Sequence, residues 1–115
     1  MRILICEDNP VIAMDLEMTF EELGHEVVGT AASRAEANTG ITVHRPDLVT
    51  IDLDLSDGPS GIHLLADVEA AGLRALIVSG QTSAYPDLSQ RAVVVPKPFV
   101  EADLVNAFAL LAAEA

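Results

Sequence analysis

The sequence has no tryptophan, one cysteine, one tyrosine and one lysine among its 115 residues. One cysteine cannot form an internal disulfide, and Cys6 lies in an apolar segment where a small buried side chain is expected. No apolar run approaches the roughly 20 residues that a membrane-spanning helix needs. The apolar run at the amino terminus is also too short for a secretory signal, so we expect a cytoplasmic protein.

Basic residues are also scarce, because 18 acidic side chains stand against six basic ones and the formal net charge is −12. Binding to nucleic acid through phosphate contacts needs a basic face, which this composition cannot supply. We therefore expect no nucleic-acid partner and no binding to an anionic membrane surface. Five of the six bases are arginines, and the only lysine is Lys97.

What the sequence does have is hydrophobic residues, which make up half of the chain and suffice for the core of one domain. Short apolar segments alternate with helical patterns. Strands are expected at 3–6, 26–30, 48–53, 75–78 and 92–95, and helices at 10–23, from 34, at 61–71 and at 101–113. This alternation predicts a doubly wound α/β fold with a parallel sheet, in a single domain over residues 1–115.

Local signals place the helix ends and the buried faces. Ser33 and Glu36 have the spacing of a capping box, and Ser60 is expected to cap the third helix. In the last helix the residues expected to face the core are Leu104, Val105, Phe108 and Leu111.

Polar residues follow four of the five expected strands. They are Glu7 and Asp8 after the first, Asp52 and Asp54 after the third, Ser79 after the fourth and Lys97 after the fifth. In a parallel α/β sheet these positions share one edge, where ligands bind. Carboxylates about 4 Å apart repel by roughly 4 kcal/mol per pair, so the cluster should take up protons or hold a cation such as Mg²⁺. With a lysine and a hydroxyl beside it, such a cluster predicts phosphoryl transfer to an aspartate nucleophile.

Four segments at these strand ends resemble the signature sites of response regulator receiver domains. They are EDN at 7–9, PDLVTID at 46–52, VSG at 78–80 and KPF at 97–99. They occur in the family's order and spacing, and the resemblance covers almost the whole chain. It implies a flavodoxin-like receiver fold with strand order 2-1-3-4-5, and a single receiver domain of a two-component or phosphorelay system.

By this resemblance, Asp52 is the phosphoacceptor, and the donor is a phosphohistidine on a histidine kinase or a histidine phosphotransfer protein. The residues implied to hold Mg²⁺ are Glu7, Asp8, Asp52 and, through its backbone carbonyl, Asp54. Ser79 and Lys97 would contact the phosphoryl group, and the bond before Pro98 is expected to be cis. Asp57 is expected to belong to the loop, beside Gly58. The output would be an altered surface for an unknown protein target, or onward transfer of the phosphoryl group.

The sequence departs from the family pattern in three places. The loop at 56–61 is one residue longer, and Val94 replaces the Tyr or Phe usual three residues before the lysine. Residues 80–91 are poor helix sequence where the family has its fourth helix, so a short or irregular helix is expected. We expect activation to be read out through this segment, with Tyr85 as a substitute aromatic.

Two other functional classes fit parts of the pattern. Asp52 and Asp54 resemble the aspartate pair of haloacid dehalogenase-type phosphatases, which would make the protein an enzyme. That family has a longer chain, whereas a receiver is a signalling phosphoacceptor with at most slow autodephosphorylation. The second alternative is a receiver-like interaction domain that works without phosphorylation. It would fold but bind neither Mg²⁺ nor beryllofluoride.

Overall fold

The computed structural model describes residues 1–113 as one five-stranded sheet covered by helices. The strands are β1 (Arg2–Cys6), β2 (Glu26–Ala31), β3 (Leu48–Ile51), β4 (Arg74–Ser79) and β5 (Val93–Pro96). The helices are α1 (Pro10–Glu22), α2 (Arg34–His44), α3 (Gly61–Ala70) and α4 (Glu101–Ala113). All neighbouring strands are parallel and the order is β2-β1-β3-β4-β5, which confirms the predicted fold.

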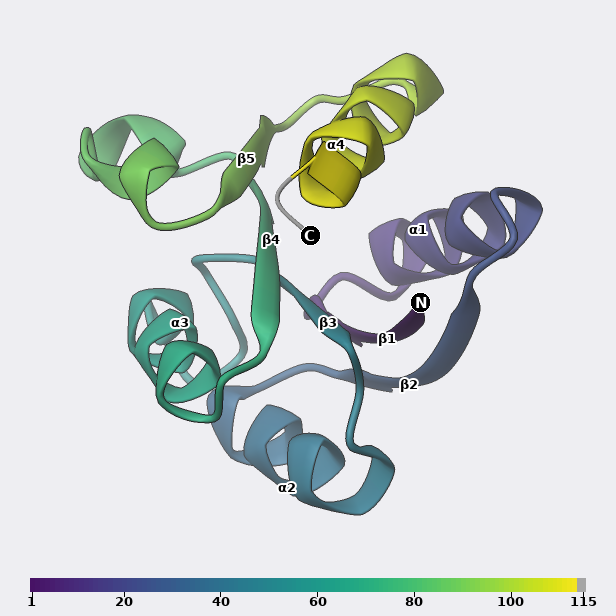
Figure 1. The fold of residues 1–115 in the computed structure, drawn as a ribbon. Helices are drawn as coiled ribbons and strands as arrows, with labels where there is room; N and C mark the ends of the chain where they lie inside the picture. Colours follow the sequence, from purple (N-terminus) through teal and green to yellow (C-terminus); the bar gives the residue numbers. More distant parts are fainter. Residues whose placement is uncertain (114–115) are drawn as a thin grey trace.

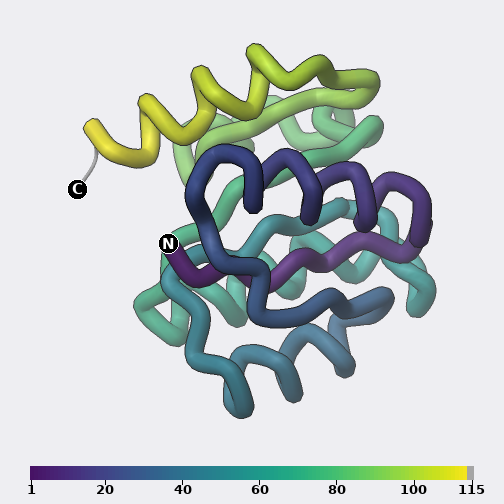
Figure 2. The backbone as a smooth tube through the Cα atoms, turned by 90° about the vertical axis from the view of Figure 1, so that its right-hand side faces the viewer, coloured from purple at the N-terminus to yellow at the C-terminus, as the bar shows by residue number. Residues whose placement is uncertain are grey.

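The sheet separates two helical layers, with α2 and α3 on one face and α1 and α4 on the other (Figure 1). The core is correspondingly divided. Val49 and Ile51 pack in the cluster on the α2–α3 side, whereas Leu48 packs in the cluster on the α1–α4 side. Burial on both faces explains why β3 is apolar without alternation. In Figure 2, β1 starts at the amino terminus and runs across the sheet, so the carboxyl ends of the parallel strands lie at the opposite edge.

One of the two predicted helix caps is confirmed, and Asn9 supplies a cap that was not predicted. The side chain of Asn9 accepts hydrogen bonds from the first turn of α1, which begins with Pro10. Ser33 caps α2, because its Oγ accepts from the amide of Glu36 at 3.1 Å, as the capping box predicts. The prediction for Ser60 is wrong: it makes no capping bond to α3, and its hydroxyl instead donates to Asp57 at 2.6 Å.

Two other expectations need correction. The strand predicted to reach Leu53 ends at Ile51, because Asp52 and Leu53 already turn toward α3. Val105 was expected in the core but is 44 % exposed. The buried residues of α4 are Leu104, Ala107 and Leu111. This stripe follows the i, i+3, i+7 spacing of a narrow helical face, and Val105 lies outside it.

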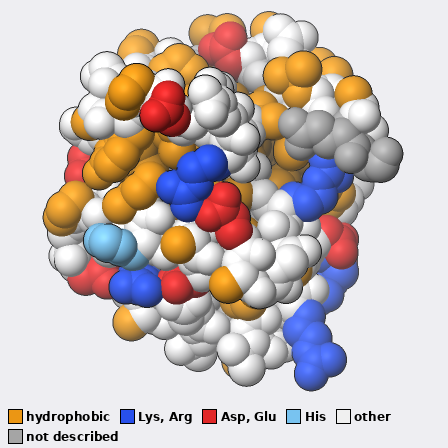
Figure 3. Space-filling view, turned by 60° about the vertical axis from the view of Figure 1, so that its left-hand side comes forward, with side chains coloured by type: hydrophobic (Ala, Val, Ile, Leu, Met, Phe, Trp, Pro, Cys, Tyr) orange, Lys and Arg blue, Asp and Glu red, His pale blue; other side chains and the backbone are white. Residues whose placement is uncertain are grey.

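Residues 80–91, where a short or irregular helix was expected, form no α-helix. They contain two single-turn 3₁₀ helices, Thr82–Ala84 and Leu88–Gln90, on either side of Pro86. Leu88 is buried, and Tyr85 packs partly buried against the same core cluster. Figure 3 brings forward this side of the molecule, where hydrophobic side chains reach the surface beside charged ones. No helix within residues 1–113 has the length and apolar character needed to cross a membrane.

Candidate functional site

The carboxyl ends of β1, β3, β4 and β5 bring together the five predicted residues that are expected to act through their side chains. They are Glu7, Asp8, Asp52, Ser79 and Lys97, and the sixth residue, Asp54, lies at the rim with an exposed side chain. Glu7, Asp52 and Ser79 are buried, whereas Asp8 is exposed. Three distant stretches of sequence therefore meet around Asp52.

Lys97 is the cation of the site. Its Nζ donates to Oε1 of Glu7 at 2.5 Å and to Oδ2 of Asp52 at 2.9 Å, and its side chain is 19 % exposed. The backbone before it is held to β4 by a bond from the Lys97 amide to the Ser79 carbonyl, and the bond to Pro98 is cis, as expected. Burial would lower the pKa of Lys97, but the hydrogen bonds to both carboxylates outweigh it and raise the pKa above its usual value.

The other carboxylate oxygen of Asp52 is fixed by neutral donors. Oδ1 accepts from Oγ of Ser79 at 2.9 Å and from the amide of Asp54 at 3.1 Å. The Ser79 hydroxyl in turn accepts from the amides of Leu53 and Gln81, at 3.3 and 3.2 Å. Both oxygens of Asp52 are thus oriented, with Lys97 on one and Ser79 on the other.

The acidic residues form a cluster suited to a metal ion. Carboxylate oxygens of Glu7, Asp8 and Asp52 lie within 4.8 Å of one another. Burial raises the pKa of Glu7, although its bonds from Lys97 and the amide of Asn9 act in the opposite direction. A donor set made only of carboxylate oxygens, beside open solvent at Asp8, fits a hard cation that keeps some of its waters, such as Mg²⁺.

Gly61, the first residue of α3, is required by the backbone of the site. A Cβ at this position would lie 2.2 Å from the carbonyl oxygen of Asp52 and 2.4 Å from the Cα of Leu53. Its amide donates to the Leu53 carbonyl at 3.1 Å. The absence of a side chain therefore lets α3 start directly against the peptide that carries Asp52.

Two residues near the site escaped the sequence prediction. Asp57 lies in the loop, as expected, but the sequence did not predict that its carboxylate accepts from the amide of Arg34 at the start of α2. Thr50, two residues before Asp52, is 1 % exposed, and its hydroxyl has no hydrogen-bond partner among the described residues. An aspartate next to glycine is a common turn signal, so only the folded path of the loop reveals the contact with α2.

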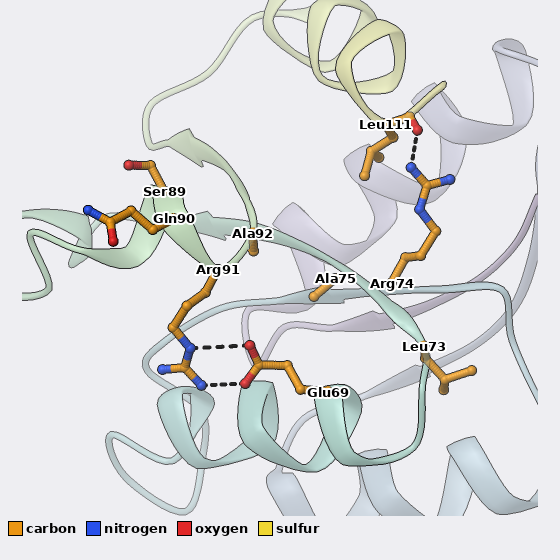
Figure 4. Close-up of a pocket in the computed structure, with 9 residues that line it drawn as sticks. All are labelled: Glu69, Leu73, Arg74, Ala75, Ser89, Gln90, Arg91, Ala92 and Leu111. Atoms are coloured by element: carbon orange, nitrogen blue, oxygen red, sulfur yellow. Dashed lines mark hydrogen bonds and ion pairs between the residues drawn. The ribbon is translucent and has the colours of Figure 1, made fainter. Parts of the chain in front are cut away.

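A cavity of about 370 Å³ lies away from this site, beside the amino-terminal end of β4. Figure 4 shows that its two arginines are engaged: Arg91 pairs with Glu69 of α3, and Arg74 donates to the carbonyl of Leu111. The Arg91–Glu69 pair joins the end of the 80–91 segment to α3. The cavity is therefore part of the packing around this segment and contains none of the predicted site residues.

Comparison with known proteins agrees with this arrangement. The family model of the response regulator receiver domain matches residues 3–109. The chain belongs to this family. The phyllosphere-induced regulator PhyR of Methylorubrum extorquens is 38 % identical to this receiver domain over 109 residues, covering 89 % of the chain and 40 % of PhyR. The transcriptional regulatory protein PdtaR of Mycobacterium tuberculosis is 33 % identical over 115 residues, covering 95 % and 55 %.

Solved structures lead to the same family. The receiver domain of PhyR from Erythrobacter litoralis, determined by NMR, superposes with a TM-score of 0.89 at 30 % identity, covering 97 % of this chain and 89 % of that one. The receiver domain described here spans about half the length of the two curated relatives. Sequence and structure together establish a receiver domain of two-component signalling with an acidic cluster at the strand ends.

Proposed function

We propose that this receiver domain accepts a phosphoryl group on Asp52 from a phosphohistidine of a kinase or phosphotransfer protein. Oδ2 or Oδ1 of Asp52 attacks phosphorus, a P–O bond forms, and the P–N bond to the imidazole breaks. The electron pair of that bond stays with the imidazole nitrogen. The observation that carries the proposal is the position of Asp52, because it is buried among Lys97, Ser79, Glu7 and Asp8 and its two oxygens are already oriented.

Each neighbour has a task in this reaction. Glu7, Asp8 and Asp52, with the backbone carbonyl of Asp54, would hold Mg²⁺, which supplies positive charge to the phosphoryl oxygens during transfer. Lys97 is placed to move from its bond with Asp52 to a phosphoryl oxygen, and Ser79 is placed to donate to a second one. Lys97, a charged donor, and Ser79, a neutral donor, would therefore each replace a hydrogen bond to the Asp52 carboxylate with one to a phosphoryl oxygen.

The consequence of phosphorylation would be a change between two conformations. The phosphoryl group adds roughly 1.5 to 2 negative charges. Its contacts with Ser79 and Lys97 must favour one conformation by about 5.5 kcal/mol to move an equilibrium from 1:99 to 99:1. We infer a single receiver domain over residues 1–115 whose output is an altered protein–protein surface or onward phosphoryl transfer, with no turnover beyond slow autodephosphorylation.

Phosphorylation by acetyl phosphate tests the proposal directly, with the intact mass of the protein as readout. Wild-type protein should gain one phosphoryl group only when Mg²⁺ is present, and Asp52→Asn should gain none. Asp87→Asn, an exposed aspartate whose carboxylate makes no hydrogen bond with the described residues, is the matched control and should behave as wild type. Phosphate on Asp52→Asn would reject the acceptor, and turnover of a free phosphomonoester would favour a phosphatase.

A further inference from the structure

The loop after β3 turns back on itself at its tip. Leu53 and Leu55 are buried, and Leu55 and Gly58 exchange two backbone hydrogen bonds, at 2.9 and 3.0 Å. Gly58 has a φ of 103°, a conformation that favours glycine. Ser56 and Asp57 therefore lie at the tip of the turn, away from Asp52 in the chain but next to the start of α2.

Asp57 anchors this tip to α2. Its two carboxylate oxygens accept from the amide of Arg34 at 3.1 and 3.3 Å, and Oδ1 also accepts from the hydroxyl of Ser60 at 2.6 Å. The Ser60 bond and the backbone amides lower the pKa of Asp57, so it is ionised at neutral pH. Arg34 is the first residue of α2, where the helix dipole favours an anion. A second bond, from the amide of Ser56 to the carbonyl of Ala32, strengthens the attachment.

Arg34, the residue of α2 that Asp57 contacts, also binds α3. The guanidinium of Arg34 forms two bonds to Asp67 of α3, at 2.7 and 3.0 Å, and Asn38 donates to Asp67 at 3.0 Å. Helices α2 and α3 lie side by side under the sheet (Figure 1). Arg34 therefore binds the tip of the loop through its amide and α3 through its side chain. The loop tip and the helix that follows the loop are thus both attached to α2.

We propose that Asp57 is a positioning residue for the metal site. The inference rests on the proposed function, in which the backbone carbonyl of Asp54 binds Mg²⁺. Asp54 is held on one side by the bond from its amide to Asp52, and on the other by the turn that Asp57 attaches to α2. This loop is one residue longer than the family pattern. The contacts of Asp57 and Ser56 with the start of α2 would fix the path of this loop, and with it the position of the Asp54 carbonyl.

The affinity for Mg²⁺ of the 115-residue chain, measured by calorimetry, tests the role of Asp57. Loss of a residue that orients a metal ligand typically weakens metal binding about tenfold or more, and we expect about tenfold for Asp57→Ala. Asp57→Asn keeps an oxygen that can accept from Arg34, so it should retain most of the affinity. Asp87→Ala, which removes an equal charge elsewhere on the surface, should bind Mg²⁺ as wild type does. The rate of phosphorylation by acetyl phosphate should fall for Asp57→Ala at low Mg²⁺ and recover at saturating Mg²⁺.

The possible outcomes distinguish a positioning role of Asp57 from an effect of its charge and from a failure of the variant to fold. If Asp57 acted only through its charge, Asn and Ala would weaken binding equally and high salt would remove the effect, which would overturn the proposal. Wild-type affinity in a folded Asp57→Ala would overturn it as well. Should Asp57→Ala fail to fold, Ser60→Ala removes one support of the same carboxylate and should weaken binding by a smaller factor. If wild-type protein bound no Mg²⁺, the proposed function itself would fall, and the role of Asp57 with it.

Discussion

The Nζ of Lys97 lies 2.9 Å from Oδ2 of Asp52, although 45 positions separate the two residues in the sequence. The same nitrogen lies 2.5 Å from Oε1 of Glu7. Both carboxylates also belong to the acidic cluster that suits a divalent cation. A divalent cation held by this cluster would therefore share these carboxylates with Lys97, and four predictions about the site and its surroundings follow.

Replacement of the lysine should make the fold depend on metal. Lys97→Met leaves two buried carboxylates without their cation, and we expect the free energy of unfolding in a chelating buffer to fall by about 2 kcal/mol. Saturating Mg²⁺ should recover most of this loss, because the ion would neutralise the same carboxylates. Urea unfolding with and without Mg²⁺ measures both values. Arg2→Met, which removes an exposed pair with Glu26 at 3.8 Å, should change little. An equal loss of stability with and without Mg²⁺ would contradict the idea that Lys97 and Mg²⁺ neutralise the same carboxylates.

Substitution of Gly61 should damage both stability and the site. A Cβ there meets the backbone of Asp52 and Leu53 at 2.2 and 2.4 Å, so Gly61→Ala must displace the start of α3 or the peptide of Asp52. We expect a loss of about 3 kcal/mol in thermal or urea unfolding and slower phosphorylation by acetyl phosphate. At Gly80 a Cβ meets no atom of the described residues within 4 Å, so Gly80→Ala is the control. Similar behaviour of the two variants would show that the close approach is unimportant.

Removal of the unpartnered hydroxyl of Thr50 should stabilise the protein. Thr50→Val replaces a buried hydroxyl that has no partner among the described residues with a methyl group of similar size. We expect the free energy of unfolding to rise by about 1 kcal/mol, the cost of leaving such a group desolvated. Thr30→Val, at an exposed position of β2, controls for strand propensity and should have a smaller effect. A decrease in stability for Thr50→Val would mean that the hydroxyl makes a favourable contact.

Activation should alter the 80–91 segment. It is attached through Ser79, whose hydroxyl accepts from the amide of Gln81, and its far end is attached to α3 by the Arg91–Glu69 pair. If Ser79 turns to a phosphoryl group, the bond to Gln81 changes and the 3₁₀ turns should respond, with Tyr85 moving at the core. Addition of beryllofluoride and Mg²⁺ should shift amide NMR signals across 80–91. Unchanged signals in this segment would exclude it as the route of readout.

The fold was predictable because its signals are local and agree with one another. Each strand is a short apolar run. Glu7 and Asp52 directly follow β1 and β3, and Ser79 is the last residue of β4, so these polar residues mark the strand ends that meet at one edge. Val105 shows where such reasoning fails. It lies next to Leu104 in a helix rich in hydrophobic residues, and only the position of α4 on the sheet decides which of them is buried. The capping role expected of Ser60 failed because Asp57 binds its hydroxyl.

The candidate site was predictable to the extent that residue type determines it. Carboxylates, a hydroxyl and a lone lysine at strand ends indicate their own chemistry, and they lie together as expected. The contacts of Asp57 with Arg34, and of Arg34 with Asp67, were not predictable. They join a loop and two helices far apart in sequence, so they depend on how the loop runs over α2.

Chemical mapping of the phosphorylated residue tests the central claim most directly. After reaction with acetyl phosphate and Mg²⁺, borohydride reduction converts an aspartyl phosphate to homoserine, and peptide mass spectrometry locates it. The account predicts homoserine at position 52 alone, and none when Mg²⁺ is chelated. Homoserine at Asp8 or Asp54, or a phosphoryl group found on a histidine of this chain, would contradict it.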